Sequence, residues 1–339
     1  MKKLLLPLLI CALFLSGCAP VQSKNKQYTA TFLSLFDTVT TVVGSAQSEE
    51  DFRLQAQQVH DALLFYHQLF DVYNEYEGFN NLKTVNDQAG IAPVEVDESI
   101  ISLLLDCRAY CQATDGMVNA AMGSVLSLWH EARSDSLNDP QNAYLPDQEA
   151  LREASLHTSF DSVVIDQQAC TVFITDPQLR LDVGAIAKGW AVQRVAAQSP
   201  SGLLISVGGN VCATGPKDEN GTRWVIGIDD PDGEGYLHTI YLSKGSVITS
   251  GDYQRAYAVD GKVYHHIIDP DTLYPSTYWR SVTIVCEDSG LGDALSTALF
   301  LLPQEQGQAL LDRFDAEALW MAADGELFYS PGFQDLIRT

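Results

Sequence analysis

The stretch LRLDVGAIAKGWAVQRV, residues 179–195, carries the pattern of a strand, a tight turn and a helix in succession. Its first residues alternate between apolar and polar side chains up to Val183, which is typical of a half-buried strand. Gly184 ends this alternation. The spacing that follows is helical, because apolar residues recur every four positions at Ala187, Ala191 and Val195.

Two charged residues of this stretch, Asp182 and Lys188, are unusual for a purely structural unit. Lys188 falls in the first helical turn, where a cation opposes the helix dipole. A docked anion would compensate, because free N–H groups at a helix start attract phosphates. On this reasoning, removing the Lys188 charge leaves the unliganded protein as stable as before or slightly more stable. The structural alternative is a solvated lysine beside an acidic turn, and Gly189 would let a ligand or another backbone approach closely.

Residues 1–17 have the layout of a secretory signal, with two lysines before a short apolar segment. That segment is too short for a comfortable membrane span. It closes with LSGC, which resembles the lipobox of bacterial lipoproteins, whose cysteine becomes N-terminal and lipid-modified. We therefore expect lipidation of Cys18, a polar tether over 18–28 and anchoring on the extracytoplasmic face of a bacterial cell membrane. The alternative is an ordinary signal peptide with a cysteine nearby.

The formal net charge of −24 excludes some partners. No run of Lys or Arg offers a nucleic-acid patch, so no nucleic-acid partner is expected. An acidic surface also argues against electrostatic adhesion to anionic lipid, so membrane attachment should depend on the lipid anchor. Five cysteines remain after the signal and Cys18, and none forms a CxxC pair. Cys107 and Cys111, four residues apart on a helical pattern, are expected to be small buried hydrophobes.

The rest of the chain intersperses helical and strand patterns, without a fixed-period repeat. Helices are expected over 48–70, 97–114 and 290–302, and a surface loop over 131–150. Strands are expected at 29–44, 163–165, 170–175, 203–209, 224–229, 240–242 and 280–286, with hairpins around Asp260-Gly261 and Asp324-Gly325. The pattern predicts one α+β domain over 29–339, with mixed or antiparallel sheets and packed helices.

Two further groups suggest chemistry. Asp293 and Thr297 lie four residues apart, so they share a helix face, and both offer the hard oxygen ligands that suit Mg²⁺. A backbone carbonyl of the Gly184-Ala185 turn is a candidate third ligand. The structural alternative is an acid that complements the helix dipole, beside a surface threonine. His266 precedes an Asp-Pro turn and is a candidate general base, although a solvated histidine is the commoner case.

Four ordered segments resemble the ApbE family of FAD:protein FMN transferases. They are LDVGAIAKGWAVQRV, LLISVGGNV, ITSGDYQRAYAVDGKVYHHIIDP and GDALSTALFLLP, and FDTVTTVV and TDGMVNAAMG extend the resemblance upstream. The resemblance covers nearly all of the chain that follows the signal. It implies a single α+β unit that binds FAD in a groove.

The resemblance also implies site residues. Flavin-nucleotide contacts would be made by Phe36, Tyr73, Met117, Val118, Asn119, Asp182, Lys188 and Ile267. Mg²⁺ would be held by the Ala185 carbonyl, Asp293 and Thr297, and His266 matches the family's histidine. The sequence departs from the family pattern at four places, namely Phe36-Asp37, Asn119, Asn210 in place of an acid, and Leu273 in place of a glycine.

The implied reaction is Mg²⁺-dependent attack of a Thr or Ser hydroxyl on the FMN-side phosphorus of FAD, with release of AMP. His266, or alternatively Asp252, would activate the hydroxyl. The expected acceptors are extracytoplasmic flavoproteins of Rnf-type or related electron-transfer complexes. Two other functions fit parts of the sequence: a Mg²⁺-dependent FAD pyrophosphatase that gives FMN and AMP, and a non-enzymatic lipoprotein that binds a flavin or another solute.

Overall fold

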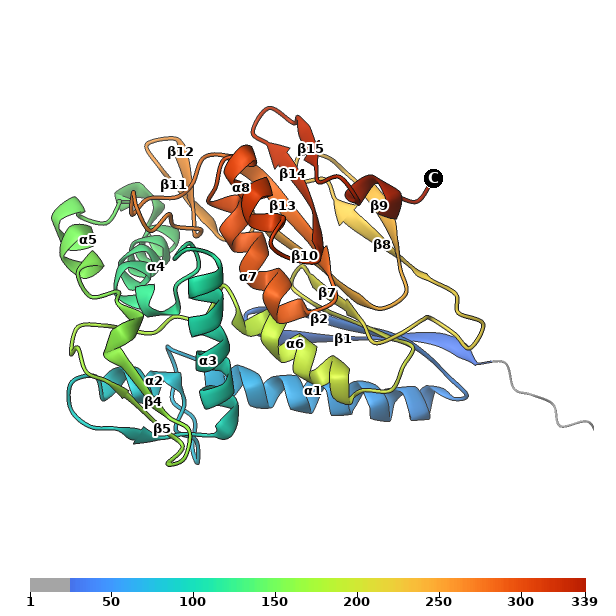
Figure 1. The fold of residues 1–339 in the computed structure, drawn as a ribbon, viewed down its shortest axis with the longest axis horizontal. Coiled ribbons are helices and arrows are strands. Elements are labelled where there is room, and N and C mark those ends of the chain that lie inside the picture. The colour runs from blue at the N-terminus through green and yellow to red at the C-terminus, as the bar shows by residue number, and fades with distance from the viewer. Residues whose placement is uncertain (1–24) are drawn as a thin grey trace, which may run out of the picture.

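The computed structural model describes residues 25–339, so the predicted signal over 1–17 and Cys18 lie outside the described residues. An eight-stranded sheet organises the fold, and each of its neighbouring pairs is antiparallel (Figure 1). Its strands, in spatial order, are β1 (Lys26–Leu35), β2 (Thr38–Ala46), β6 (Leu203–Val207), β7 (Asn210–Ala213), β10 (Gly245–Gly251), β13 (Trp279–Cys286), β14 (Ala316–Ala322) and β15 (Leu327–Tyr329).

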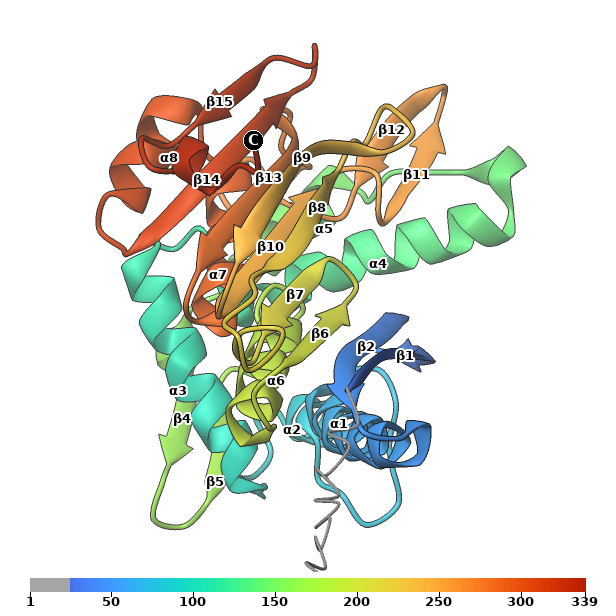
Figure 2. The same cartoon turned by 90° about the vertical axis from the view of Figure 1, so that its right-hand side faces the viewer.

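Three helices pack on one face of this sheet. They are α1 (Glu49–Phe70), which is capped by Ser48, α6 (Ala187–Gln198) and α7 (Ser289–Phe300). The other face is covered by the hairpin of β8 (Trp224–Asp229) and β9 (Tyr236–Leu242), as Figure 2 shows. Successive side chains of β10 point to opposite faces of the sheet, so Ile248 packs toward the helices and the preceding Val247 packs toward β8 and β9.

The remaining elements form smaller units beside the large sheet and its helices. A small sheet joins β3 (Val94–Glu95), β5 (Thr171–Ile174) and β4 (Val163–Asp166), and a hairpin joins β11 (Ala256–Val259) to β12 (Lys262–His265). The other helices are α2 (Leu82–Asp87), α3 (Glu98–Ala113), α4 (Gly123–Asn138), α5 (Gln148–Ser155) and α8 (Gln304–Leu311). The structure confirms an α+β fold with antiparallel sheets. In the described part, the five cysteines are free, and no helix combines the length and apolarity needed to cross a membrane.

Three predicted elements were wrong. The strand expected over 29–44 is two strands, joined by a turn in which Phe36 and Asp37 both have positive φ, of 51° and 55°. This turn lacks the Gly or Asn that usually marks it. The loop expected over 131–150 instead contains the end of α4 and the start of α5.

The segment 179–183, predicted to be a strand, has no strand partner among the described residues. Its backbone is satisfied differently. The buried Asn86 side chain accepts a hydrogen bond from the Leu181 N–H at 2.7 Å and donates to the Leu181 carbonyl at 3.0 Å. The Asp182 N–H donates to the Ala120 carbonyl at 2.8 Å. The alternating pattern therefore correctly predicted that one side of this segment is buried. It wrongly predicted a strand, because an amide side chain makes the backbone hydrogen bonds that a neighbouring strand would make.

Candidate active site

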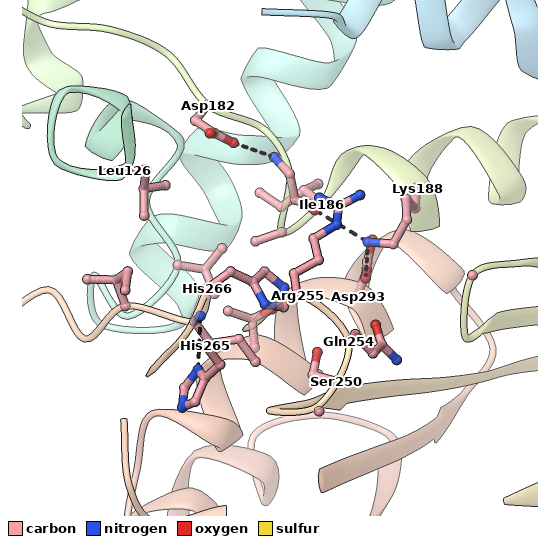
Figure 3. Close-up of a pocket in the computed structure, with 18 of the residues that line it drawn as sticks. Leu126, Asp182, Ile186, Lys188, Ser250, Gln254, Arg255, His265, His266 and Asp293 are labelled. Carbon is pink, nitrogen blue, oxygen red and sulfur yellow. Dashed lines mark hydrogen bonds and ion pairs between the residues drawn. The ribbon is translucent and has the colours of Figure 1, made fainter. Parts of the chain in front are cut away.

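A cavity of about 750 Å³ opens where the start of α6, the start of α7 and the end of β10 meet the segment after β12 (Figure 3). Eleven of the thirteen residues predicted for FAD, metal or catalysis line it. They are Tyr73, Met117, Val118, Asn119, Asp182, Ala185, Lys188, His266, Ile267, Asp293 and Thr297. Residues separated by more than two hundred positions in the sequence therefore face one space.

The other two predicted residues, Phe36 and Asp252, do not line this cavity. The Phe36 ring packs edge-on against His67, with ring centroids 5.5 Å apart, while the adjacent Asp37 lines the cavity. The Asp252 carboxylate lies 3.4 Å from the Arg280 guanidinium, and burial raises its pKa. The roles of Phe36 as a flavin contact and of Asp252 as a catalytic base remain predictions.

Lys188 and Asp293 form an ion pair in the cavity, beside the residues predicted to bind a metal, and they point toward one another in Figure 3. Nζ of Lys188 lies 3.6 Å from Oδ1 of Asp293 and donates to the Gly184 carbonyl at 3.4 Å. The lysine does lie in the first turn of α6. The anion that compensates for its unfavourable position in the unliganded protein is thus the Asp293 carboxylate.

Asp293 is 4% exposed, and burial raises its pKa, opposed by Lys188, the Gly189 N–H and Asn210. The Gly189 N–H donates to Oδ2 of Asp293 at 2.8 Å. In a regular helix this amide would donate to the Ala185 carbonyl four residues earlier. Because the amide bonds to the carboxylate, the Ala185 carbonyl is not required as its acceptor and can face a ligand.

Gly189 is needed for a close approach, as predicted. A Cβ there would lie 2.2 Å from the Ser289 carbonyl oxygen and 2.6 Å from Cβ of Asp293. Real Cβ atoms do not approach other atoms so closely, so a side chain would force α6 away from α7. The approach of two backbones, which brings Asp293 to the start of α6, therefore depends on glycine at 189.

The three predicted metal ligands, the Ala185 carbonyl, the Asp293 carboxylate and the Thr297 hydroxyl, belong to residues that line one cavity. The described residues contain no group of three or more His, Cys, Asp or Glu side chains suited to a metal ion. These residues therefore do not form a thiolate or imidazole metal site, or one in which side chains supply every ligand. They fit a hard cation such as Mg²⁺, which binds through few protein carboxylates and completes its shell with water and phosphate oxygens.

The two adjacent histidines have different roles. His265 is buried, and its ring donates from Nε2 to the Ser276 carbonyl at 2.7 Å and accepts the Ile267 N–H at Nδ1. This satisfied histidine holds the segment after β12 in place. His266 lies on the cavity wall, and part of its side chain is accessible from the cavity. Removal from bulk water, and then the charges of Arg255 and Lys188, lower the pKa of His266, so the ring is neutral and can accept a proton.

Several lining residues were missed by the sequence analysis. Arg255, His130 and Arg133 line the cavity, and the His130 ring stacks on the predicted Tyr73 ring with centroids 4.4 Å apart. Arg133 was missed because it falls in the surface loop expected over 131–150, whereas α4 continues to Asn138. Nothing in the sequence around His130 marked it as a site residue. Arg255 lies three residues after Asp252, in the segment 248–270, whose predicted site residues were Asp252, His266 and Ile267.

The structure explains one departure from the expected family pattern, Asn119, and shows the backbone conformation of another, Leu273. The Asn119 amide donates to the Thr158 carbonyl at 2.9 Å, a bond that an ionised Asp could not make, while its oxygen caps the turn at Ala121. Leu273 adopts φ of 62°, in the left-handed region that a glycine would occupy more easily. Its carbonyl accepts the Trp129 indole N–H at 2.9 Å.

The fold is an antiparallel α+β domain, and its cavity brings together a helix start, a lysine, a buried carboxylate and a neutral histidine. Such a cavity suits a phosphate-bearing ligand and a hard cation. The family model described as "ApbE family" matches residues 36–320. The chain belongs to the ApbE family.

Known relatives agree with this membership. A "FAD:protein FMN transferase" of Treponema pallidum is 35% identical over 278 residues, which are 76% of this chain and 75% of the relative. One of Klebsiella pneumoniae is 33% identical over 254 residues, covering 73% and 76% of the two chains. The crystal structure of the ApbE protein of Thermotoga maritima superposes with a TM-score of 0.82 at 31% identity, over 93% of this chain and 100% of that one.

Proposed function

We propose that this chain transfers the FMN moiety of FAD to a Thr or Ser hydroxyl of a target flavoprotein and releases AMP. Family membership, and relatives of this name above 30% identity over three quarters of both chains, support the transferase activity. The observation that carries the chemistry is the convergence of Lys188, Asp293 and His266 on one cavity.

The bond changes balance without a further reactant. The acceptor hydroxyl oxygen forms a bond to the FMN-side phosphorus, the bond from that phosphorus to the bridging oxygen breaks, and AMP leaves with that oxygen. His266, already neutral, takes the hydroxyl proton. Lys188 and the N–H groups at the start of α6 would meet the diphosphate charge.

We propose Mg²⁺ as the cofactor, held by the Ala185 carbonyl, Asp293 and Thr297. A bound Mg²⁺ supplies Lewis-acid stabilisation of the charge that develops on the phosphates. The residues of this chain would supply the rest. A cation held by Asp293 would compete with Lys188 for the same buried carboxylate. The Lys188 ammonium would then be available to a phosphate oxygen in the same cavity.

The cellular setting is also a proposal. LSGC at 15–18 supports lipidation of Cys18, and so anchoring on the extracytoplasmic face of a bacterial membrane. The acceptors would then be extracytoplasmic flavoproteins, with subunits of Rnf-type or related electron-transfer complexes as the first candidates.

Mass spectrometry of a candidate acceptor, incubated with the protein, FAD and Mg²⁺, tests the proposal. Transfer predicts an FMN adduct on a Thr or Ser of the acceptor and an equivalent amount of AMP. Asp293→Asn is the matched control, because it keeps the shape of the side chain and removes its charge. FMN and AMP in solution without adduct would identify a pyrophosphatase, and unchanged FAD would leave only a binding protein.

A further inference from the structure

Asn210 has an unexplained polar group beside the proposed metal site. It is the first residue of β7, 0% exposed, and lines the cavity next to the Gly208-Gly209 turn. Its Nδ2 is buried and makes no hydrogen bond of ordinary geometry among the described residues, although it lies close enough to the Asp293 carboxylate to oppose the rise in that group's pKa. A buried N–H donor without an acceptor is costly, so this group calls for an explanation.

The other end of the same amide is firmly held, which determines where Nδ2 points. Oδ1 of Asn210 accepts from the Ser289 hydroxyl at 2.6 Å, and the Ser289 N–H donates to Gln193 at 2.8 Å. With Oδ1 committed to Ser289, the NH₂ group faces the site. A Cβ on Gly189 would lie 2.9 Å from Nδ2 of Asn210 and 2.6 Å from Cβ of Asp293, so both side chains crowd the same point. The amide is close enough to favour the ionised form of Asp293.

We propose that Asn210 is a positioning residue that makes cation binding at Asp293 depend on the nucleotide. Two consequences follow from its chemistry. As a donor, its NH₂ group orients the carboxylate, together with the Gly189 N–H. As a neutral group, it adds no second carboxylate beside Asp293, whose charge Lys188 balances. The unliganded site therefore has little net charge, and a divalent cation binds firmly only when a diphosphate adds negative charge.

An acid at 210 would change this balance without changing the size of the side chain. Ser289 would still donate to one carboxylate oxygen, while the other would face Asp293. Two buried carboxylates side by side repel each other and favour a cation between them. Asn210→Asp should then bind a divalent cation without nucleotide, whereas Asn210→Ser removes the donor and should weaken binding. Loss of a group that orients a metal ligand typically costs about 10–100-fold in affinity.

This inference rests on the proposed metal site, and Mn²⁺ is the probe that tests it. Free Mn²⁺ is measured by electron paramagnetic resonance during titration of the full chain, first without FAD and then with it. We expect about tenfold tighter binding for Asn210→Asp and at least tenfold weaker binding for Asn210→Ser. FAD should strengthen Mn²⁺ binding markedly in the wild type and much less in Asn210→Asp. The matched control is Asn81→Ser, which alters an equally buried amide at the start of α2, outside the cavity.

The two substitutions must move Mn²⁺ affinity in opposite directions, which a purely structural role for Asn210 does not predict. Equal affinities, or a loss in both variants, would overturn the proposal. If the wild type binds no Mn²⁺ without FAD, Asn210→Asp must create binding that is lost again with Asp293→Asn, and failure to do so also overturns it. Asp293→Asn alone tests the site itself. If that variant binds Mn²⁺ as the wild type does, the metal site of the proposed function is misplaced.

Discussion

Replacing Lys188 with methionine separates its structural role from its role toward a ligand. Methionine keeps much of the apolar stem and removes the charge. The sequence alone suggested no loss of stability, because a cation in the first turn of α6 opposes the helix dipole. The structure reverses this expectation, since Lys188 is the counter-charge of a carboxylate whose side chain is 5% exposed.

The magnitude follows from the geometry of the pair. Removing one partner of a fully buried ion pair costs about 3–5 kcal/mol, because a charge is left without compensation. Lys188 is 24% exposed and its Nζ lies 3.6 Å from the carboxylate oxygen, and Asp293 keeps the Gly189 N–H. Relief of the dipole clash returns a few tenths of a kcal/mol or more. We therefore expect Lys188→Met to lower the free energy of unfolding by about 1–3 kcal/mol.

Thermal unfolding of the FAD-free protein, with and without Mg²⁺, measures this effect. The Tm should fall by roughly 2–8 °C, and Mg²⁺ should reduce the difference by neutralising Asp293. Lys244→Met is the control, because its pair with Glu287 is exposed and worth little. FAD affinity, measured by calorimetry, should fall about tenfold or more when an ammonium–phosphate contact is lost. An unchanged or raised Tm would refute the structural reasoning, and an unchanged FAD affinity would refute the phosphate contact.

Four further predictions concern other residues. Asp293→Ala should abolish Mg²⁺-dependent transfer, and full activity of the folded variant at limiting Mg²⁺ would contradict the metal assignment. The pKa of His266 is lowered, so protonation of this ring should not reduce the transfer rate between pH 8 and 6.5. As the pH falls below 6.5, the unfolded state takes up this proton more readily than the folded state, and the free energy of unfolding should decrease. His266→Gln should lose less stability than the wild type over that range in pH-dependent unfolding. Gly189→Ala should destabilise by about 1–3 kcal/mol in denaturant unfolding, because the added methyl meets the Ser289 carbonyl. Cys18→Ala should release the protein from membranes or leave it unprocessed in fractionation, and unchanged attachment together with an unlipidated wild type would contradict the anchor.

Much of the site could be predicted because its residues lie at the ends of elements with strong local patterns. The helix after Gly184 and the helix near 290 have clear apolar spacing. This places Lys188 in the first turn of one helix, and Asp293 and Thr297 four residues apart on one face of the other. What failed depended on unusual local chemistry. The Phe36-Asp37 turn uses two left-handed residues that are not glycine, and the segment at 179–183 pairs with an amide side chain instead of a strand.

The pairing of Lys188 with Asp293 could not be predicted, because it depends on a contact between two helices whose starts are about a hundred residues apart in the chain. Local pattern correctly indicated that the lysine needs an anion, and the phosphate of a ligand was the obvious candidate. The fold supplies its own anion by packing α7 against Gly189, so Lys188 and Asp293 neutralise each other in the unliganded protein. A cation and a diphosphate together can replace this internal pair, since the cation takes the carboxylate and the phosphate takes the ammonium. A diphosphate alone would leave the buried Asp293 carboxylate unpaired, and a cation alone would leave the half-buried Lys188 without its partner. This would favour joint binding of FAD and a cation at the proposed site.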